Sequence, residues 1–360
     1  MKYVADWDKT QKRFEAFWEC ELVDRCCISI QAPRYSEKGY DQIELPEKYE
    51  DRIAYWTDGE NILSRHIRLH ESTYFAGDAF PTITLNFGPS GHAGFYKDMK
   101  FQFEDSVWFF PLDIDWEAHD SALVFDQNSF LYNSMINVAK YLADNNRDRY
   151  IIGNPHFSGD GDALAHLRGS QNFMVDLATQ APYIHPIMQN LQETWFRAYD
   201  AVHEIIKYAN HNITAVSSFR VMGQGRVAST QCDLACMISN GQYEEYFLPY
   251  LKKQLAYVDK GFYHLDGCEQ LRHLDSLLSI QELKAIQWQV VEGQPSPVHF
   301  ISELKKIQAA GKGIILFVKD DELEPIMSEL SSKGLFLSMN ACSQQHADEI
   351  IKLVETLTHE

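Results

Sequence analysis

His264, Asp266 and Cys342 are the residues of this 360-residue chain whose types and spacing could support metal chemistry. His264 and Asp266 end the run FYHLD, and residues two apart in a strand face the same side. Cys342 follows the run LFLSM. Imidazole, carboxylate and thiolate are all zinc ligands, and three protein ligands leave one position open for substrate. The sequence therefore predicts a zinc site of His264, Asp266 and Cys342, in which His264 and Asp266 are also catalytic.

The same three residues have a metal-free interpretation. His264 and Asp266 could hydrogen-bond a substrate or each other. Cys342 could be a small buried hydrophobic residue, because a free cysteine often packs as one. Both interpretations stay open from the sequence.

Polar residues that follow other apolar runs are candidate substrate contacts. Arg34 comes after CISIQ, Asn86 ends TITLN, and His156 and Asp160 lie in NPHFSGDGD after YIIG. Asp233 in QCDLACMIS precedes an apolar stretch, so its carboxylate either caps a short helix or acts on substrate. We predict Arg34, Asn86, His156 and Asp160 as substrate-binding residues and Asp233 as a catalytic one.

Eight short apolar runs alternate with helical patterns along the chain, which is typical of a (β/α)8 barrel. In such a barrel the chemistry lies at the carboxyl ends of the strands, where the residues above fall. The runs lack strict alternation, as strands buried on both faces do. The predicted strands are 27–31, 82–86, 150–153, 213–218, 262–266, 285–290, 313–318 and 335–339, and the main helical stretches are 133–145, 165–180, 187–209, 243–258, 298–310 and 347–356.

We predict that residues 1–360 form one domain with additions to the barrel. Residues 1–26 read as a helical preface, and residues 36–75 as a helical excursion after the first strand. Residues 87–148 read as a long insertion or lid after the second strand, with a hairpin within 101–116. The alternative, a two-domain α/β chain, lacks a linker of suitable composition.

Composition limits the class of partner. The formal net charge is −19, and an anionic surface repels phosphate backbones, which argues against nucleic acid and anionic membranes. No stretch approaches the ~18 apolar residues that cross a bilayer. The start of the chain lacks a secretory signal pattern, and seven cysteines show no framework spacing. We therefore expect a cytoplasmic protein with free thiols. CxxC, GxSxG and HExxH motifs are absent.

Several short motifs, in order and spacing, resemble the uroporphyrinogen decarboxylase superfamily, most closely its corrinoid-dependent methyltransferase branch. They are the segment from Asp233 through MISNGQYEEYFLPYLKKQL, then FYHLDG, then LLSIQELKAIQWQVVEGQP. The resemblance also includes DLATQAP and the closing helix, and is strongest from about Arg149 onward. It implies a (β/α)8 barrel, in agreement with the count of runs.

The resemblance implies one of two chemistries. Decarboxylases of the superfamily grip their substrate through an RQAGRY-like segment, which here reads Ile30 to Tyr35 and keeps only Arg34. Its zinc methyltransferases carry a His-x-Cys and a later Cys. His264 and Cys342 match the outer positions, while Asp266 replaces the middle cysteine. A carboxylate in that position makes a harder zinc site, or leaves Asp266 to hold substrate.

The resemblance therefore favours methyl transfer between a small methyl donor or acceptor, or a thiol, and a corrinoid on a separate partner protein. Zinc is the expected cofactor. A metal-free decarboxylase or lyase acting on a small carboxylate, with Arg34 as its anion clamp, is the first alternative. A non-catalytic ligand-binding relative is the second. The sequence is consistent with a monomer or a homodimer.

Overall fold

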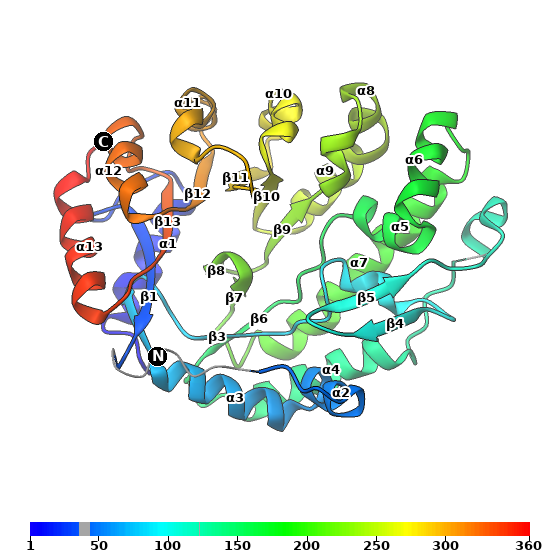
Figure 1. Cartoon of the computed structure of the whole chain (residues 1–360), viewed down its shortest axis with the longest axis horizontal. Coiled ribbons are helices and arrows are strands. Elements are labelled where there is room, and N and C mark those ends of the chain that lie inside the picture. The colour runs from blue at the N-terminus through cyan, green and yellow to red at the C-terminus, as the bar shows by residue number, and fades with distance from the viewer. Residues whose placement is uncertain (36–43, 122) are drawn as a thin grey trace.

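Two sheets of mainly parallel strands, with helices packed around them, make up the computed structural model of this chain (Figure 1). It describes residues 1–35, 44–121 and 123–360. The predicted excursion 36–75 and insertion 87–148 therefore contain positions outside the described residues. No helix of the described residues is long and apolar enough to cross a membrane.

The larger sheet holds seven strands in the order β2-β1-β13-β12-β11-β10-β9, all parallel except β2. Its strands are β1 (Cys27–Pro33), β2 (Thr73–Gly77), β9 (Val227–Gln231), β10 (Lys260–Asp266), β11 (Leu283–Gln289), β12 (Gly313–Phe317) and β13 (Leu335–Asn340).

The smaller sheet holds four strands in the order β3-β6-β7-β8, and a separate hairpin pairs β4 with β5. Its strands are β3 (Thr82–Thr84), β6 (Ile151–Gly153), β7 (Ile213–Val216) and β8 (Val221–Gln224), and those of the hairpin are β4 (Lys100–Phe103) and β5 (Val107–Phe110). The hairpin spans residues 100–110, so it begins one residue before the segment 101–116 in which the sequence predicted a hairpin.

The predicted closed barrel is not confirmed. All eight predicted runs contain a parallel strand, but in the described part of the chain these eight strands fall into two separate sheets. The antiparallel β2 takes the edge of β1 that would face β3, and the antiparallel β8 takes an edge of β7. A strand has only two hydrogen-bonding edges, so these two partners interrupt the ladder between β2 and β3 and between β8 and β9.

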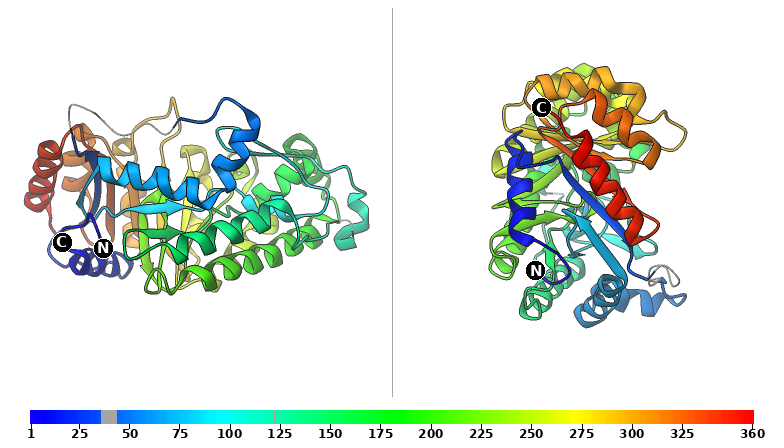
Figure 2. Two further views of the ribbon diagram at one scale, coloured as in Figure 1. Left: turned by 90° about the horizontal axis from the view of Figure 1, so that it is seen from below. Right: turned by 90° about the vertical axis from the view of Figure 1, so that its left-hand side faces the viewer.

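Helices cover the outside of both sheets. α3, α4 and α7 lie side by side along one face, whereas α9 to α13 follow the larger sheet (Figures 1 and 2). The helices are α1 (Trp7–Trp18), α2 (Tyr49–Thr57), α3 (Gly59–Ser72), α4 (Phe130–Asp144), α5 (Asp160–Arg168), α6 (Ser170–Thr179), α7 (Ile184–Ile206), α8 (Asn240–Gln242), α9 (Leu248–Tyr257), α10 (Leu274–Leu278), α11 (Ile301–Ala309), α12 (Asp320–Glu329) and α13 (Gln344–Leu357).

The predicted preface 1–26 contains α1, which packs against the strands of the larger sheet. Phe14 and Phe17 of α1 pack at a tilt against Phe336 of β13, and the three rings are buried. Trp18 donates from Nε1 to the carbonyl of Met222 at 2.8 Å. Because β8 carries Met222, α1 joins the two sheets.

Candidate active site

Neighbouring strands β9, β10 and β11 place a row of polar side chains at one level of the larger sheet. Gln231 of β9 is in register with His264 of β10, and His264 is in register with Gln287 of β11. Asp266 lies two residues beyond His264, so both side chains share one side of β10. Nε2 of His264 is 3.9 Å from Oδ1 of Asp266. The predicted proximity of this histidine and carboxylate is present.

The tautomer of His264 follows from its contact with Gln287. Gln287 donates from Nε2 to the carbonyl of Trp288 at 2.8 Å, so its Oε1 is the acceptor that contacts Nδ1 of His264. Nδ1 must then carry a proton, and in the neutral form of the ring Nε2 presents a lone pair near the Asp266 carboxylate. The lone pair and the carboxylate are both hydrogen-bond acceptors, so they repel each other. A proton or a cation between them removes this repulsion. The pair can therefore hold a cation or take a proton from a substrate.

Gln231 connects His156 to Asp233. Its Nε2 donates to both carboxylate oxygens of Asp233, at 3.0 and 3.1 Å, and its Oε1 accepts from Nε2 of His156 at 2.9 Å. Burial, together with the charge of protonated His264, lowers the pKa of His156 to about 4. His156 is therefore a neutral donor at physiological pH, and the bond to Gln231 fixes its ring.

The side chain of Asp233 is exposed on one side, and protein surrounds it on the others. Desolvation by that surrounding protein raises its pKa; the charge of Asp266 adds to this and that of His264 opposes it. The backbone N–H of Asp233 donates to Oδ1 of buried Asp162 at 2.8 Å. The short helix at 233–237 has no side-chain cap, so Asp233 does not cap it. A carboxyl group with a raised pKa can act as a proton donor.

Phe219 contacts this polar cluster, and its neighbour in the sequence lines a pair of cavities. Its ring lies 5.1 Å from that of His264 and 5.6 Å from that of His156. The preceding residue, Ser218, lines both cavities. The segment 218–219 therefore contacts both the cavities and the cluster.

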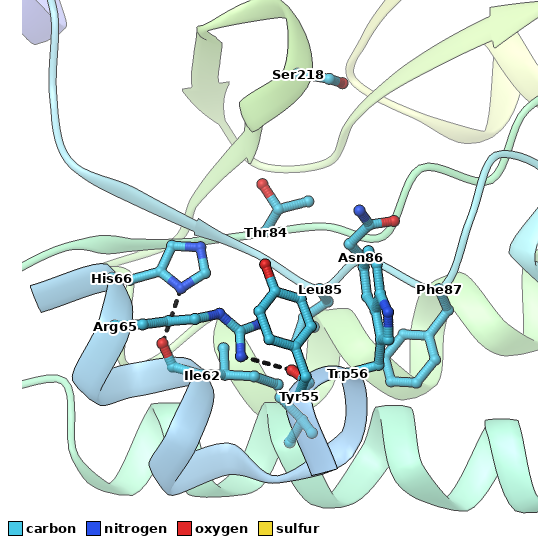
Figure 3. Close-up of a pocket in the computed structure, with 11 residues that line it drawn as sticks. Tyr55, Trp56, Ile62, Arg65, His66, Thr84, Leu85, Asn86, Phe87 and Ser218 are labelled. Carbon is cyan, nitrogen blue, oxygen red and sulfur yellow. Dashed lines mark hydrogen bonds between the residues drawn. The ribbon is translucent and has the colours of Figure 1, made fainter. Parts of the chain in front are cut away.

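The first cavity has a volume of about 310 Å³ and includes predicted Asn86 in its wall (Figure 3). The second, of about 560 Å³, shares His66, Thr84 and Ser218 with it. It is lined by Thr73 of β2 and Thr82 of β3, the strands at which the ladder is interrupted. The break between the two sheets is therefore the opening that forms the second cavity.

Asp160 and Arg34, both predicted substrate contacts, lie elsewhere. Asp160 is buried at the start of α5, with Oδ1 3.4 Å from Nε2 of buried His92, and burial raises its pKa. Arg34 donates from Nη2 to the carbonyl of Thr73 at 2.8 Å and lines a third cavity with Asp348. The structure does not place either residue among those that line the first two cavities.

Cys342, the third predicted zinc ligand, contacts His346 rather than His264. Its Sγ is 3.3 Å from Nδ1 of His346. It follows β13, and β11 and β12 lie between that strand and β10. Among the described residues no group of three or more His, Cys, Asp or Glu side chains is placed to hold a metal ion. The structure thus brings together two of the three predicted ligands.

Gln231, Gln287 and Phe219 contribute to the site but were not predicted from the sequence. Gln287 had a detectable signal, because it is a polar residue inside the predicted strand AIQWQV and is fully buried. Gln231 had a weaker one, since it ends a strand of small and hydroxylated residues. Phe219 could not be distinguished from the other aromatic residues of the core.

Comparisons with known proteins support the fold only. The chain is an α/β protein whose two larger sheets are built mainly of parallel strands. No protein-family model and no curated protein matches its sequence. Among solved structures, a methyltransferase from Methanosarcina mazei is similar, with a TM-score of 0.60 over 96% of this chain and 98% of that chain. Sequence identity is 12%, so the likeness is one of fold.

Proposed function

We propose that this chain is a methyltransferase that moves a methyl group between a small substrate or thiol and a corrinoid carried by a separate partner protein. The observation that carries the proposal is the cluster of His264, Asp266 and Asp233 at the strand ends. Support also comes from the fold shared with a methyltransferase over nearly the full length of both chains. Membership of the uroporphyrinogen decarboxylase superfamily, with its (β/α)8 barrel, belongs to the same proposal.

The side chains of the cluster have distinct roles in this scheme. When the methyl group leaves a heteroatom of the substrate, that atom keeps the bonding electron pair and needs a proton. Asp233, whose pKa is raised, donates it. In the opposite direction Asp233 or Nε2 of His264 accepts the proton of a thiol as it is methylated. His156 and Gln231 hold Asp233 in place.

Zinc is a separate part of the proposal. His264 and Asp266 would hold it, and bound zinc would lower the pKa of a substrate thiol. The described residues do not place Cys342 as the third ligand, so we derive no chemical step through the metal. Elemental analysis of protein purified without chelator tests this. About one zinc per chain, reduced in His264→Ala and in Cys342→Ala, would support the predicted ligands. Zinc lost only in His264→Ala would remove Cys342 from the set.

Methyl transfer is tested by following the absorbance of methylcobalamin with a panel of small thiols, and that of reduced cobalamin with small methylated compounds. We expect a change in wild type that falls by about 100-fold in His264→Ala. His299→Ala is the matched control, because His299 is an exposed histidine outside the cluster. If no combination changes the spectrum in wild type, or if both variants behave alike, the proposal is wrong.

A further inference from the structure

Arg65 is a nearly buried cation with no acidic partner among the described residues, and it lies in the wall of the first cavity. It projects from α3 and is 8% exposed. Its Nη1 donates to the carbonyl of Tyr55 at 2.6 Å and to Oδ1 of Asn61 at 2.9 Å. The Tyr55 ring covers the guanidinium, with 3.7 Å between Cζ and the ring centroid. A desolvated charge without a counter-charge is costly unless something compensates it.

The guanidinium is fixed in a way that leaves one edge for a ligand. Both bonds use Nη1, and within the described part of the chain Nε and Nη2 have no hydrogen-bond partner. Nε and Nη2 form the edge that binds a carboxylate through two parallel bonds. Because Tyr55 and Asn61 already hold the Arg65 side chain in place, little further conformational entropy of this side chain would be lost when a ligand binds.

The charges of the cavity walls agree with an anionic ligand. Within the described ranges, no Asp or Glu lines the first or the second cavity. Arg65 lines the first and Arg220 the second. Arg65 therefore gives the first cavity a positive charge within a strongly negative protein, which favours anions over neutral molecules.

His66, the next residue on α3, adds a hydrogen-bond acceptor. Its Nδ1 contacts the carbonyl of Ile62 at 2.8 Å, so this nitrogen carries the proton (Figure 3). Burial lowers the pKa of His66 to about 4, and the charge of Arg65 contributes, so the ring is neutral. Nε2 is left as a lone pair on a ring that lines both cavities. Nε2 can therefore accept a hydrogen bond from an O–H or N–H group of a ligand.

Buried apolar side chains complete the first cavity. Trp56, Leu85 and Phe87 line it and are each at most 7% exposed. Asn86 accepts from the N–H of Gly88 through Oδ1, so its Nδ2 remains a donor at the rim. The cavity thus combines apolar walls with polar groups, which suits a ligand with an apolar part and a polar part.

We propose that this cavity binds a small organic carboxylate, held by Arg65, that carries a hydroxyl or other donor for Nε2 of His66 and an apolar group for Trp56 and Phe87. The identification of this ligand as the methyl-transfer substrate rests on the proposed function. Its binding does not, because binding is measured without a corrinoid. A failure of one proposal is therefore distinguishable from a failure of the other.

Isothermal titration calorimetry with mandelate tests the site, because mandelate joins a carboxylate, a hydroxyl and an aromatic ring. Phenylacetate lacks the hydroxyl and mandelamide lacks the charge. We expect mandelate to bind most tightly, phenylacetate more weakly and mandelamide not at all. No detectable binding of mandelate at about 10 mM, or equal binding of mandelate and mandelamide, would overturn the proposal.

Two variants and a matched control locate the binding. Arg65→Gln should weaken mandelate binding about 10- to 100-fold, whereas Arg68→Gln, an exposed arginine of the same helix, should leave it unchanged. Equal effects of these two variants would contradict the site. His66→Phe should reduce the affinity for mandelate to that for phenylacetate. If Arg65→Gln fails to fold, Arg65→Lys keeps the charge, loses the two-bond edge and should bind about tenfold more weakly.

Discussion

Sγ of Cys342 lies 3.3 Å from Nδ1 of His346. The backbone N–H of Cys342 also donates to this nitrogen, at 3.3 Å, so Nδ1 is an acceptor and the ring proton is on Nε2. Nε2 in turn lies 3.3 Å from Oδ2 of Asp320, at the start of α12. Cysteine, histidine and aspartate are thus arranged in series, with the imidazole oriented to take the thiol proton.

We expect Cys342 to be the first thiol alkylated by iodoacetamide, because the thiolate is the reactive form and Cys342 is exposed. Cys26, Cys27 and Cys232 are buried, and burial raises the pKa of each thiol. Mass spectrometry of partly labelled protein would identify the site. His346→Ala should slow labelling of Cys342 about tenfold, and His299→Ala should not. Equal rates in these variants would show that His346 does not activate the thiol.

Gln287 fixes the tautomer of His264, so Gln287→Leu should lower methyl transfer about tenfold while leaving the fold intact. Leucine has a similar volume but cannot accept from Nδ1, so the imidazole becomes free to rotate and to protonate on Nε2. The loss should fall on kcat more than on KM. Gln345→Leu, at an exposed glutamine, is the control. Unchanged kcat in Gln287→Leu would remove Gln287 from the site.

Strands with apolar sequences could be predicted from the sequence, whereas a strand with a polar sequence could not. Each of the eight apolar runs contains a strand, whereas β9 was not predicted because Ser229, Thr230 and Gln231 are polar although buried. Thr230 is accommodated by donating its hydroxyl to the carbonyl of Phe262 at 3.3 Å. The antiparallel β2 and β8, which interrupt the ladder, follow from tertiary pairing and had no local signal.

The site could be predicted within one strand but not between strands. His264 and Asp266 share a side of β10 because alternation is a local property of the backbone. The position of Cys342 depends on where the chain turns after β13, and there the nearest imidazole is four residues ahead, at His346. The cavity residues Arg65 and His66 come from a helix whose sequence, SRHIRLH, gave no sign of which face meets β3.

Asp162 should make the protein less stable as the pH rises. It is buried, and burial together with the charge of Asp233 raises its pKa well above the usual range. The folded state then binds the proton more tightly than the unfolded state, so stability falls above the unfolded pKa of about 4. Asp162→Asn keeps the acceptor for the N–H of Asp233 and removes the charge.

We therefore expect Asp162→Asn to be more stable than wild type at pH 8, on the order of 1–2 kcal/mol, and closer to it at pH 5. Urea unfolding at the two pH values measures this. Asp113→Asn, at an exposed aspartate, should differ little from wild type at either pH. A variant that loses stability at pH 8 would indicate that the Asp162 carboxylate is needed in its charged form.

We expect His70 to lower the free energy of unfolding of the protein at acidic pH. It is 3% exposed, Nε2 donates to the carbonyl of Thr82 at 3.0 Å, and burial lowers the pKa to about 4. A lowered histidine pKa means that the unfolded state takes up the proton first. Its contribution to stability is present above pH 6.5 or so and is lost as the pH falls toward 4.

Between pH 7.5 and pH 4.5 this one histidine should account for about 2 kcal/mol of the loss in unfolding free energy. His70→Gln keeps a donor for Thr82 but does not titrate, so its urea midpoint should fall less on acidification than that of wild type. His299→Gln should follow wild type, because His299 is exposed. If His70→Gln and wild type lose the same stability, protonation of His70 does not drive acid unfolding. The histidines to vary next are then His66 and His156, whose pKa values burial also lowers to about 4.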